Sequence, residues 1–304
     1  MRQRFAYWAF RIVILIMRPV PLRLAYRVAG GVAVLCYLWV FPRHRRGLKA
    51  NLRQVLPDAA DADIERIARQ GFRNFGKYVI DVIHFPTMTR EEVRRRLRFD
   101  QWDELNEMRD SGRGVVIATL HFGNWDLGGA ALAACGYRIN AIAERFDYEP
   151  MNTLVQGSRA RLGMTIIAGD RTGPRVFRLL KDGQFLAMLI DVVDEQFAVE
   201  VEFFGAPARV SAAPARIALR TGAWVMPAVV LRDSGDDTII RPVIGAELRD
   251  FTPSGDEAAD VRALTQAIVR WLEPQIRAHI EQWFIMTPIW RTSDGSEGRD
   301  PGGA

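Results

Sequence analysis

One short segment of the chain places a histidine and a carboxylate at a spacing that suits acid–base chemistry. In residues 121–126, with the sequence HFGNWD, His121 is followed by Asp126. A carboxylate that hydrogen-bonds one imidazole nitrogen holds the ring in one tautomer and stabilises its protonated form, which equips the other nitrogen to take a proton from a hydroxyl. We therefore predict that His121 is a general base and that Asp126 orients it.

The context of this segment is more informative than its spacing. In a chain with four histidines and 36 acidic residues, the probability that at least one His-x4-acid match occurs by chance is about one half. However, an apolar strand predicted over residues 115–120 runs directly into His121, and a short helix is predicted after Asp126. Ligands in open α/β sheets bind beyond the carboxyl ends of the strands, so His121 is expected at a functional edge. The other histidines have no acid at the same spacing: His44, His84 and His279.

The elements that must position this segment follow an alternating pattern. Short apolar strands, separated by helical stretches, are predicted at residues 115–120, 139–143, 165–168, 185–190 and 224–231. This alternation predicts an α/β fold with a mixed, mainly parallel central sheet flanked by helices. Residues 238–244 follow a turn-like segment and are expected to form an antiparallel edge. Amphipathic helices are predicted up to about residue 85 and over residues 257–284, where Pro274 should kink or break the second one.

The amino-terminal region is apolar but regularly interrupted by arginines. Its longest uncharged run, residues 28–42, has fifteen residues, whereas a helix that spans a bilayer needs roughly 20. Aromatic residues and a basic cluster at 43–49 suit the headgroup region of an anionic membrane and its cytoplasmic flank. We expect hydrophobic helices in residues 1–42 that associate with the cytoplasmic face of the cell (inner) membrane. A helical pair packed on the catalytic body remains the alternative, because periodicity does not separate core from interface.

Composition sets the outer limits of the prediction. The chain has 304 residues, of which 49 % are hydrophobic and 25 % charged, as in globular proteins. Its net charge of +5 favours acidic partners, which include nucleic acid, anionic lipid headgroups and acidic carrier proteins, and charge alone does not choose among them. No nucleic-acid motif is present, and the anionic membrane surface is expected from the amino-terminal region. Two cysteines indicate neither a disulfide framework nor a zinc site. We predict membrane-associating helices over 1–42, a catalytic domain over 43–291 and a disordered tail over 292–304.

Several ordered motifs between roughly residues 48 and 290 resemble a known family. They are ANLRQVLPD, TLHFGNWDLGG, AIAERFD, SRARLGM, the long segment LIDVVDEQFAVEVEFFGAPARVSAAPARIALRTGAWVMPAVV, and EQWF near the end. The chain resembles the lysophospholipid acyltransferase superfamily in its branch of lipid A biosynthesis (lauroyl or myristoyl) acyltransferases and phosphatidylinositol mannoside acyltransferases. The resemblance implies a glycerolipid-acyltransferase-like fold and an O-acyltransferase that acts in lipopolysaccharide or mannoside biosynthesis.

The same resemblance implies roles for individual residues. His121 looks like the general base of the family and Asp126 like its orienting acid. Glu144 is similar to a third catalytic group, a carboxylate that approaches the histidine in the mannoside branch. Arg159, in SRARLGM, resembles an arginine near the donor or acceptor headgroup. Asp191 occupies the position of an acid that helps to shape the substrate site.

The mechanism implied by the resemblance is direct acyl transfer. An acceptor hydroxyl on a glycolipid or phospholipid attacks an acyl thioester, carried by acyl-carrier protein or acyl-CoA as a substrate, without a resident cofactor or metal. The absence of a Gly-x-Ser-x-Gly elbow from the sequence agrees with this route. Backbone N–H groups near Gly123 and Asn124 are expected to stabilise the oxyanion, and Asn124 is included among the predicted substrate-binding residues.

Two departures and two alternatives leave part of the prediction open. Val192 and Val193 follow Asp191 where many lipid A acyltransferases have Gln or Arg, and residues 281–290 lack an arginine-rich run. The acceptor is therefore open. One alternative is a catalytically silent lipid-binding membrane adaptor with the same fold. The other is a metal-dependent hydrolase that uses His121, Asp126 and Asp191 as ligands, although no metal-ligand motif is recognisable.

Overall fold

A six-stranded mixed sheet forms the centre of the protein. The structure, a computed structural model, describes residues 2–169 and 173–290. The strand order is β3-β2-β4-β1-β7-β8, in which β8 alone is antiparallel to its neighbour. The strands are β1 (Val115–Thr119), β2 (Ile139–Ala143), β3 (Thr165–Ala168), β4 (Phe185–Leu189), β7 (Trp224–Arg232) and β8 (Ile240–Ile244). The predicted mixed, mainly parallel sheet is confirmed, including its antiparallel edge.

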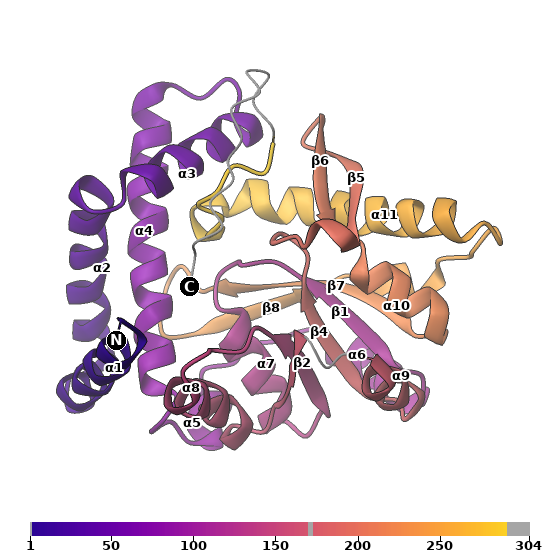
Figure 1. Ribbon diagram of the computed structural model, residues 1–304, viewed down its shortest axis with the longest axis horizontal. Helices are drawn as coiled ribbons and strands as arrows, with labels where there is room; N and C mark the ends of the chain where they lie inside the picture. Colours follow the sequence, from indigo (N-terminus) through magenta and orange to yellow (C-terminus); the bar gives the residue numbers. More distant parts are fainter. Residues whose placement is uncertain (1, 170–172, 291–304) are drawn as a thin grey trace.

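Helices cover both faces of this sheet. Successive side chains of a strand point to opposite faces, and in β1 this alternation divides the core. Val115 and Ile117 pack in one cluster with α5, α6 and α7, whereas Val116 and Ala118 pack in another with α9, α10 and α11. These helices are α5 (Arg90–Arg95), α6 (Trp102–Asp110), α7 (Trp125–Ala134), α9 (Gly173–Lys181), α10 (Ala213–Thr221) and α11 (Glu257–Ala278), and α8 (Glu149–Arg161) contacts β3. Figure 1 shows this layered arrangement.

A separate two-stranded hairpin stands on the α11 side of the sheet. It consists of β5 (Ala198–Phe203) and β6 (Ala206–Ser211), which pair antiparallel. Its inward side chains Val201 and Phe203 join the larger core cluster, and Gln266 of α11 exchanges two hydrogen bonds with the backbone of Glu202. The strands predicted from the sequence did not include this second sheet.

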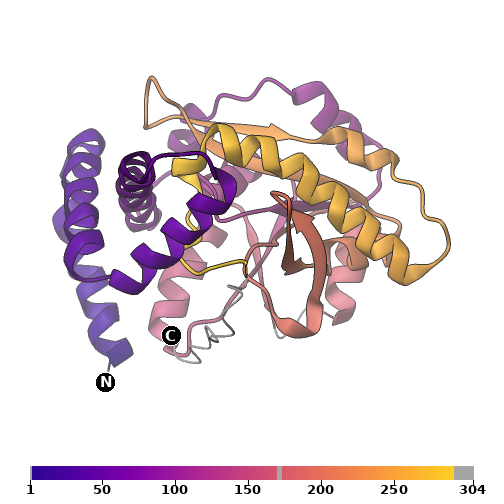
Figure 2. The same cartoon turned by 90° about the horizontal axis from the view of Figure 1, so that it is seen from above.

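The amino-terminal helices lie at one end of the molecule. They are α1 (Arg2–Met17), α2 (Leu22–Trp39), α3 (Pro42–Val55) and α4 (Asp61–His84). Both views place α4 between α2 and the sheet (Figures 1 and 2). The approach of α2 to α4 is close at Gly76, where a Cβ atom would lie 2.8 Å from the carbonyl oxygen of Ala29. A residue without a side chain is therefore required there.

Among the described helices, only α2 has the length and hydropathy to cross a bilayer. Core helices and signal sequences share these properties, but only 22 % of the α2 segment is buried within the protein. Its neighbour α1 is exposed in the same way, with Phe5, Leu15 and Ile16 each more than half exposed. The two helices thus leave a wide apolar surface uncovered.

The carboxyl-terminal helix differs from its prediction at Pro274. We expected a kink or break there, but α11 continues through Pro274 to Ala278 and is followed by a 3-10 turn at Ile280–Gln282. Proline removes one helical hydrogen bond, to the carbonyl of the residue four positions earlier. That residue is Arg270, which is exposed, so water can take over the bond. The predicted disordered tail, 292–304, lies outside the described residues.

Candidate active site

His121 lies just beyond the carboxyl end of β1, as predicted. The neighbouring strand β4 is parallel to β1 and pairs Thr119 with Leu189, so Asp191 emerges beside His121 at the same edge. The Nδ1 atom of His121 is 2.9 Å from Oδ1 of Asp191. The carboxylate thereby selects the tautomer with a proton on Nδ1, which leaves Nε2 as the basic nitrogen. The His121 side chain is 27 % exposed, so the ring remains accessible.

Three hydrogen bonds hold Asp191 in place. Its Oδ2 atom accepts from the backbone N–H of His121 at 2.9 Å and from Nε1 of Trp283 at 3.2 Å, in addition to the bond that Oδ1 makes with the ring. The Asp191 side chain is only 1 % exposed. Donors on both oxygens hold the carboxylate in one orientation against the imidazole.

The surroundings of His121 change its basicity in two directions. Burial of the ring lowers its pKa, but the charge of Asp191, the hydrogen bond to Asp191 and the charge of Asp126 together outweigh burial. The net effect raises the pKa of His121 above its ordinary value. A more basic imidazole is a better proton acceptor once it is neutral.

Asp126 does not have the predicted role of orienting His121. Its Oδ2 atom accepts hydrogen bonds from the hydroxyl of Tyr78 at 2.8 Å and from Nη2 of Arg159 at 2.7 Å. The reason is geometric, because Asp126 is in the first turn of α7, where its side chain meets α4 and α8, while β4 delivers Asp191 directly to the ring. Asp126 acts on His121 through its charge alone.

Arg159, predicted to bind substrate, lies next to Asp126 of the histidine motif. It extends from α8 to Asp126 and also donates from Nη1 to Oε1 of Gln156 at 2.9 Å. Its side chain is 15 % exposed, and its buried Nε–H has no hydrogen-bond acceptor among the described residues. Arg159 therefore has one buried donor without an acceptor among the described residues.

The structure does not bring Glu144 to His121. Glu144 follows β2, and β4 lies between β2 and β1 in the sheet. Its side chain is exposed, and the hydrogen bond described for this residue joins its backbone oxygen to Gln156. The predicted approach of a third carboxylate to the histidine is therefore absent from the described contacts.

Asn124 has a structural role in place of the predicted contact with substrate. It is fully buried, its Oδ1 atom accepts from the N–H of Leu127 as the N-cap of α7, and its Nδ2 atom donates to Asp81 at 2.7 Å. The backbone N–H groups of Gly123 and Asn124, expected to face an oxyanion, donate to the carbonyl oxygens of Gln282 and Val230. Gly123 has a φ of +59°, and a Cβ atom there would overlap the carbonyl oxygen of Val230.

Comparison with known sequences decides the family. The sequence profile described as bacterial lipid A biosynthesis acyltransferase matches residues 1–292. The chain belongs to this family. It is accordingly an O-acyltransferase. Two relatives, each named phosphatidylinositol mannoside acyltransferase, are a protein of Mycobacterium tuberculosis (strain CDC 1551 / Oshkosh), 30 % identical over 85 % of this chain and 81 % of its own length, and one of Mycolicibacterium smegmatis (strain ATCC 700084 / mc(2)155), 27 % identical over 80 % and 78 %.

This acyltransferase has a buried ionic cluster next to residues 120–124, here called the histidine loop. The sequence analysis did not predict this cluster. Asp81 of α4 is 0 % exposed and pairs with Arg96 and Arg232, each at 2.7 Å, while the hydroxyl of Tyr26 donates to it at 2.5 Å. Burial raises the pKa of Asp81, but the two guanidinium charges outweigh it and lower the pKa overall. The signal in the sequence was a carboxylate between Ile80 and Ile83, on an otherwise apolar face.

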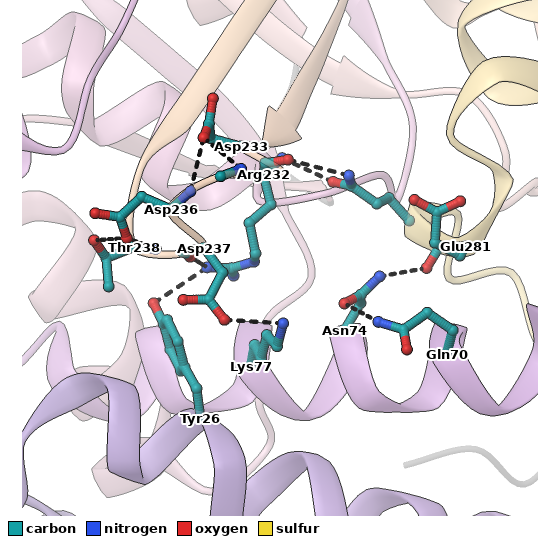
Figure 3. Close-up of polar contacts among 12 residues, drawn as sticks. Tyr26, Gln70, Asn74, Lys77, Arg232, Asp233, Asp236, Asp237, Thr238 and Glu281 are labelled. Carbon is teal, nitrogen blue, oxygen red and sulfur yellow. Dashed lines mark hydrogen bonds and ion pairs between the residues drawn. The ribbon is translucent and has the colours of Figure 1, made fainter.

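The EQWF motif, residues 281–284, forms backbone hydrogen bonds with the histidine loop. The N–H of Phe284 donates to the carbonyl oxygen of His121 at 2.8 Å, and Gln282 accepts from Gly123. Figure 3 shows that Asn74 of α4 donates a hydrogen bond to the backbone oxygen of Glu281, the first residue of this motif. It also shows the guanidinium of Arg232 pointing toward Tyr26. Residues far apart in the sequence thus hold His121 at one position.

Four aromatic rings, here called the aromatic wall, stand beside His121. They are Phe75, Tyr78, Trp125 and Phe284. Trp125 meets the His121 ring edge-on with centroids 5.0 Å apart and stacks on Tyr78 at 4.2 Å. The wall restricts water on one side of the imidazole. Within residues 2–169 and 173–290, no group of three His, Cys, Asp or Glu side chains is placed to hold a metal ion.

Proposed function

We propose that this O-acyltransferase moves a fatty acyl chain from an acyl thioester to a hydroxyl of a membrane glycolipid or phospholipid, with His121 as the general base. The observation that carries the proposal is the bond between Nδ1 of His121 and the buried carboxylate of Asp191. It leaves Nε2 unprotonated in the neutral ring and stabilises the ring after it has accepted a proton.

In the proposed reaction, Nε2 of His121 takes the proton of the acceptor hydroxyl while its oxygen attacks the thioester carbonyl carbon. The tetrahedral intermediate then collapses, the carbon–sulfur bond breaks, and the leaving thiolate takes the proton back from the imidazolium. Asp191 balances the positive charge while it exists. No acyl-enzyme forms in this scheme.

Two groups near His121 are proposed to stabilise the negative charge that develops on oxygen. The N–H groups of Trp125 and Asp126 begin α7, and no acceptor for either is described. Hydrogen-bond donors and the positive end of a helix dipole both favour an anion at such a position. The Nε–H of Arg159 is proposed to bind a polar group of the thioester or of the acceptor headgroup.

The acceptor is proposed from the relatives. All three curated relatives are named phosphatidylinositol mannoside acyltransferase, whereas the family profile is named for lipid A biosynthesis. A phosphatidylinositol mannoside is therefore the first acceptor to test, and a lipid A precursor is the second. Acyl-CoA and acyl-carrier protein are both proposed as donors.

The acyltransferase is also proposed to work on the cytoplasmic face of the cell (inner) membrane. Exposed apolar residues cover α1 and α2, and the exposed arginines Arg43 and Arg46 begin α3. Apolar side chains next to basic ones match the interface of an anionic bilayer. The same surface would bring the active site to lipid acceptors.

The proposal is tested with purified protein in anionic vesicles, supplied with acyl-CoA or acylated carrier protein and with each acceptor. Lipid products are identified by mass spectrometry. We expect His121→Ala to lower the rate of transfer about 10²-fold or more, because it removes the general base. His84→Ala is the matched control, since His84 makes a local bond to the carbonyl oxygen of Ile80. Equal rates for wild type and His121→Ala would overturn the assignment of the base.

A further inference from the structure

An apolar groove lies between the amino-terminal helices. Its volume is about 560 Å³, within the roughly 300–1,000 Å³ of small-molecule sites. Val28 and Val32 of α2 form one wall, and Val79 and Ile83 of α4 form the other. Each of the two α2 valines is 53 % exposed, so the groove is open to the outside.

The lining of the groove selects for hydrocarbon. Apart from the thiol of Cys36 and the imidazole of His44, the side chains that line it are apolar. A polar ligand would lose its hydration there without gaining hydrogen bonds, whereas an alkyl chain would leave water on favourable terms. The groove is lined mainly by α2 and α4, with Val13 and Met17 of α1 at its border.

The groove and the aromatic wall share one residue. Phe75 lines the groove and is also part of the aromatic wall, with its ring 5.8 Å from Tyr78 and 5.6 Å from Phe284. Tyr78 stacks on Trp125, which contacts His121. The groove therefore borders the aromatic wall, whose other rings lie between Phe75 and His121.

We propose that the groove binds one acyl chain of the lipid acceptor and so positions the acceptor hydroxyl near His121. This inference rests on the proposed function. The choice of acceptor over donor follows from the location of the groove. It opens at α2, which carries exposed apolar residues such as Leu35 and Trp39 and which we place at the membrane. A lipid already in the bilayer can slide a chain into this opening, whereas a thioester on a soluble carrier arrives from water.

The first test measures lipid binding without requiring catalysis. Full-length protein is exchanged from vesicles of palmitoyl-oleoyl phosphatidylglycerol into mild detergent, and bound lipid is counted by native mass spectrometry. Val32→Trp fills the groove from an exposed position, and we expect the lipid-bound fraction to fall about tenfold or more. Leu35→Trp is the matched control, because Leu35 lies on the same helix and is 58 % exposed but does not line the groove. Equal retention by Val32→Trp and wild type would overturn the proposal.

The second test separates acceptor from donor. With the acceptor that the vesicle assay identifies, we expect Val32→Trp to raise the KM for the intact lipid about tenfold or more. The KM for the thioester, and the rate with the deacylated acceptor headgroup, should remain those of wild type. A raised KM for the thioester alone would assign the groove to the donor and refute the proposal. Val28→Trp, on the same wall, replaces Val32→Trp if circular dichroism shows that Val32→Trp is unfolded.

Failure of this inference and failure of the proposed function are distinguishable. Wild type that retains phosphatidylglycerol in a groove-dependent way but transfers no acyl group would contradict the proposed function and leave the groove a lipid site. Wild type that transfers acyl groups at a rate unaffected by Val32→Trp or Val28→Trp would contradict only the groove.

Discussion

At the scale of single residues, two carboxylates act on one histidine by different routes. Asp191 receives the ring N–H directly, while Asp126 is occupied by Tyr78 and Arg159 and contributes only its charge. The short motif in the sequence contains the second carboxylate but not the first. Substitution of each acid separately should therefore give different kinetic results.

We predict that Asp191→Asn lowers kcat about 10²-fold or more. The backbone N–H of His121 and the indole N–H of Trp283 both donate to Oδ2, so the amide oxygen of Asn would occupy that place. The amide NH₂ group would then face Nδ1 and force the proton onto Nε2, which could no longer act as a base. The measurement is kcat in the vesicle assay, with Asp126→Asn as the matched change of the other acid. A larger loss of kcat in Asp126→Asn would restore Asp126 as the orienting acid.

The same variant should change the pH dependence. In the proposed mechanism activity requires neutral His121, so kcat/KM rises as pH increases through the pKa of this residue, and the raised pKa places the acid limb of wild type at higher pH than for an unperturbed histidine. Asp191→Asn removes the neighbouring charge and the favourable hydrogen bond, which lowers the pKa of His121 and moves the acid limb to lower pH. An acid limb that stays in place would show that Asp191 does not set the basicity of His121.

At the scale of elements, α4 connects the amino-terminal helices to the active site. Asn74, Tyr78 and Asp81 are spaced by four and three residues and therefore share one face of the helix. Asn74 donates a hydrogen bond to the backbone of Glu281, and Tyr78 donates one to Asp126. Asp81 accepts one from the N-cap residue of α7. The neighbouring face, which includes Gly76, packs on α2 and lines the groove. One helix thus sets the position of the histidine loop relative to the groove.

We predict that Asp81→Asn is strongly destabilising. It leaves Arg96 and Arg232 buried without a compensating charge, which costs about 3–5 kcal/mol, or a fall in melting temperature of about 6 °C or more for a chain of this size. Tryptophan fluorescence during heating in detergent measures this change. Asp61→Asn is the control, because the Asp61 carboxylate pairs with Arg53 at an exposed site and should leave the melting temperature unchanged. Equal melting temperatures for both variants would show that the buried cluster does not stabilise the fold.

At the scale of the whole molecule, exposed apolar surface gathers at one end, next to the exposed arginines that begin α3. Exposed large apolar residues occur along α1 and α2, while α11 begins at the far end of the protein and runs back toward α4 (Figures 1 and 2). This polarity predicts a defined orientation on an anionic bilayer, with α1 and α2 against the lipid and the start of α11 away from it.

Neutralising charge at the two ends should have unequal effects on membrane binding. We expect Arg43→Gln with Arg46→Gln to weaken binding to phosphatidylglycerol vesicles roughly 30-fold, since each basic residue near the surface contributes about 1 kcal/mol. Arg262→Gln with Arg270→Gln on α11 makes the same change in net charge and should leave binding unchanged. Vesicle sedimentation at several salt concentrations measures both, and screening should reduce the difference as salt increases. Equal weakening by the two pairs would refute the proposed orientation.

Much of the fold was determined by the sequence alone. The predicted strands at 139–143 and 165–168 match β2 and β3, and the antiparallel edge was expected from the turn before β8. Successive side chains of a strand point to opposite faces, and parallel strands are connected by helices. The strands and the helices between them can therefore be predicted from the local pattern of apolar residues. For the same reason the position of His121 at the end of a strand could be predicted.

The partners of His121, by contrast, were decided by the tertiary structure. Asp191 is 70 positions away, and Trp283 approaches from the end of the chain, so neither contact has a spacing that could reveal it. Strand order placed β4 beside β1 and moved Glu144 away, while the first turn of α7 directed Asp126 to Arg159. A short motif contains only residues that are close in the sequence. The hydrogen bonds of its side chains also depend on which strands and helices become neighbours after folding. The sequence therefore located His121 at the edge of the sheet, and the packing of the sheet determined which carboxylate bonds its ring.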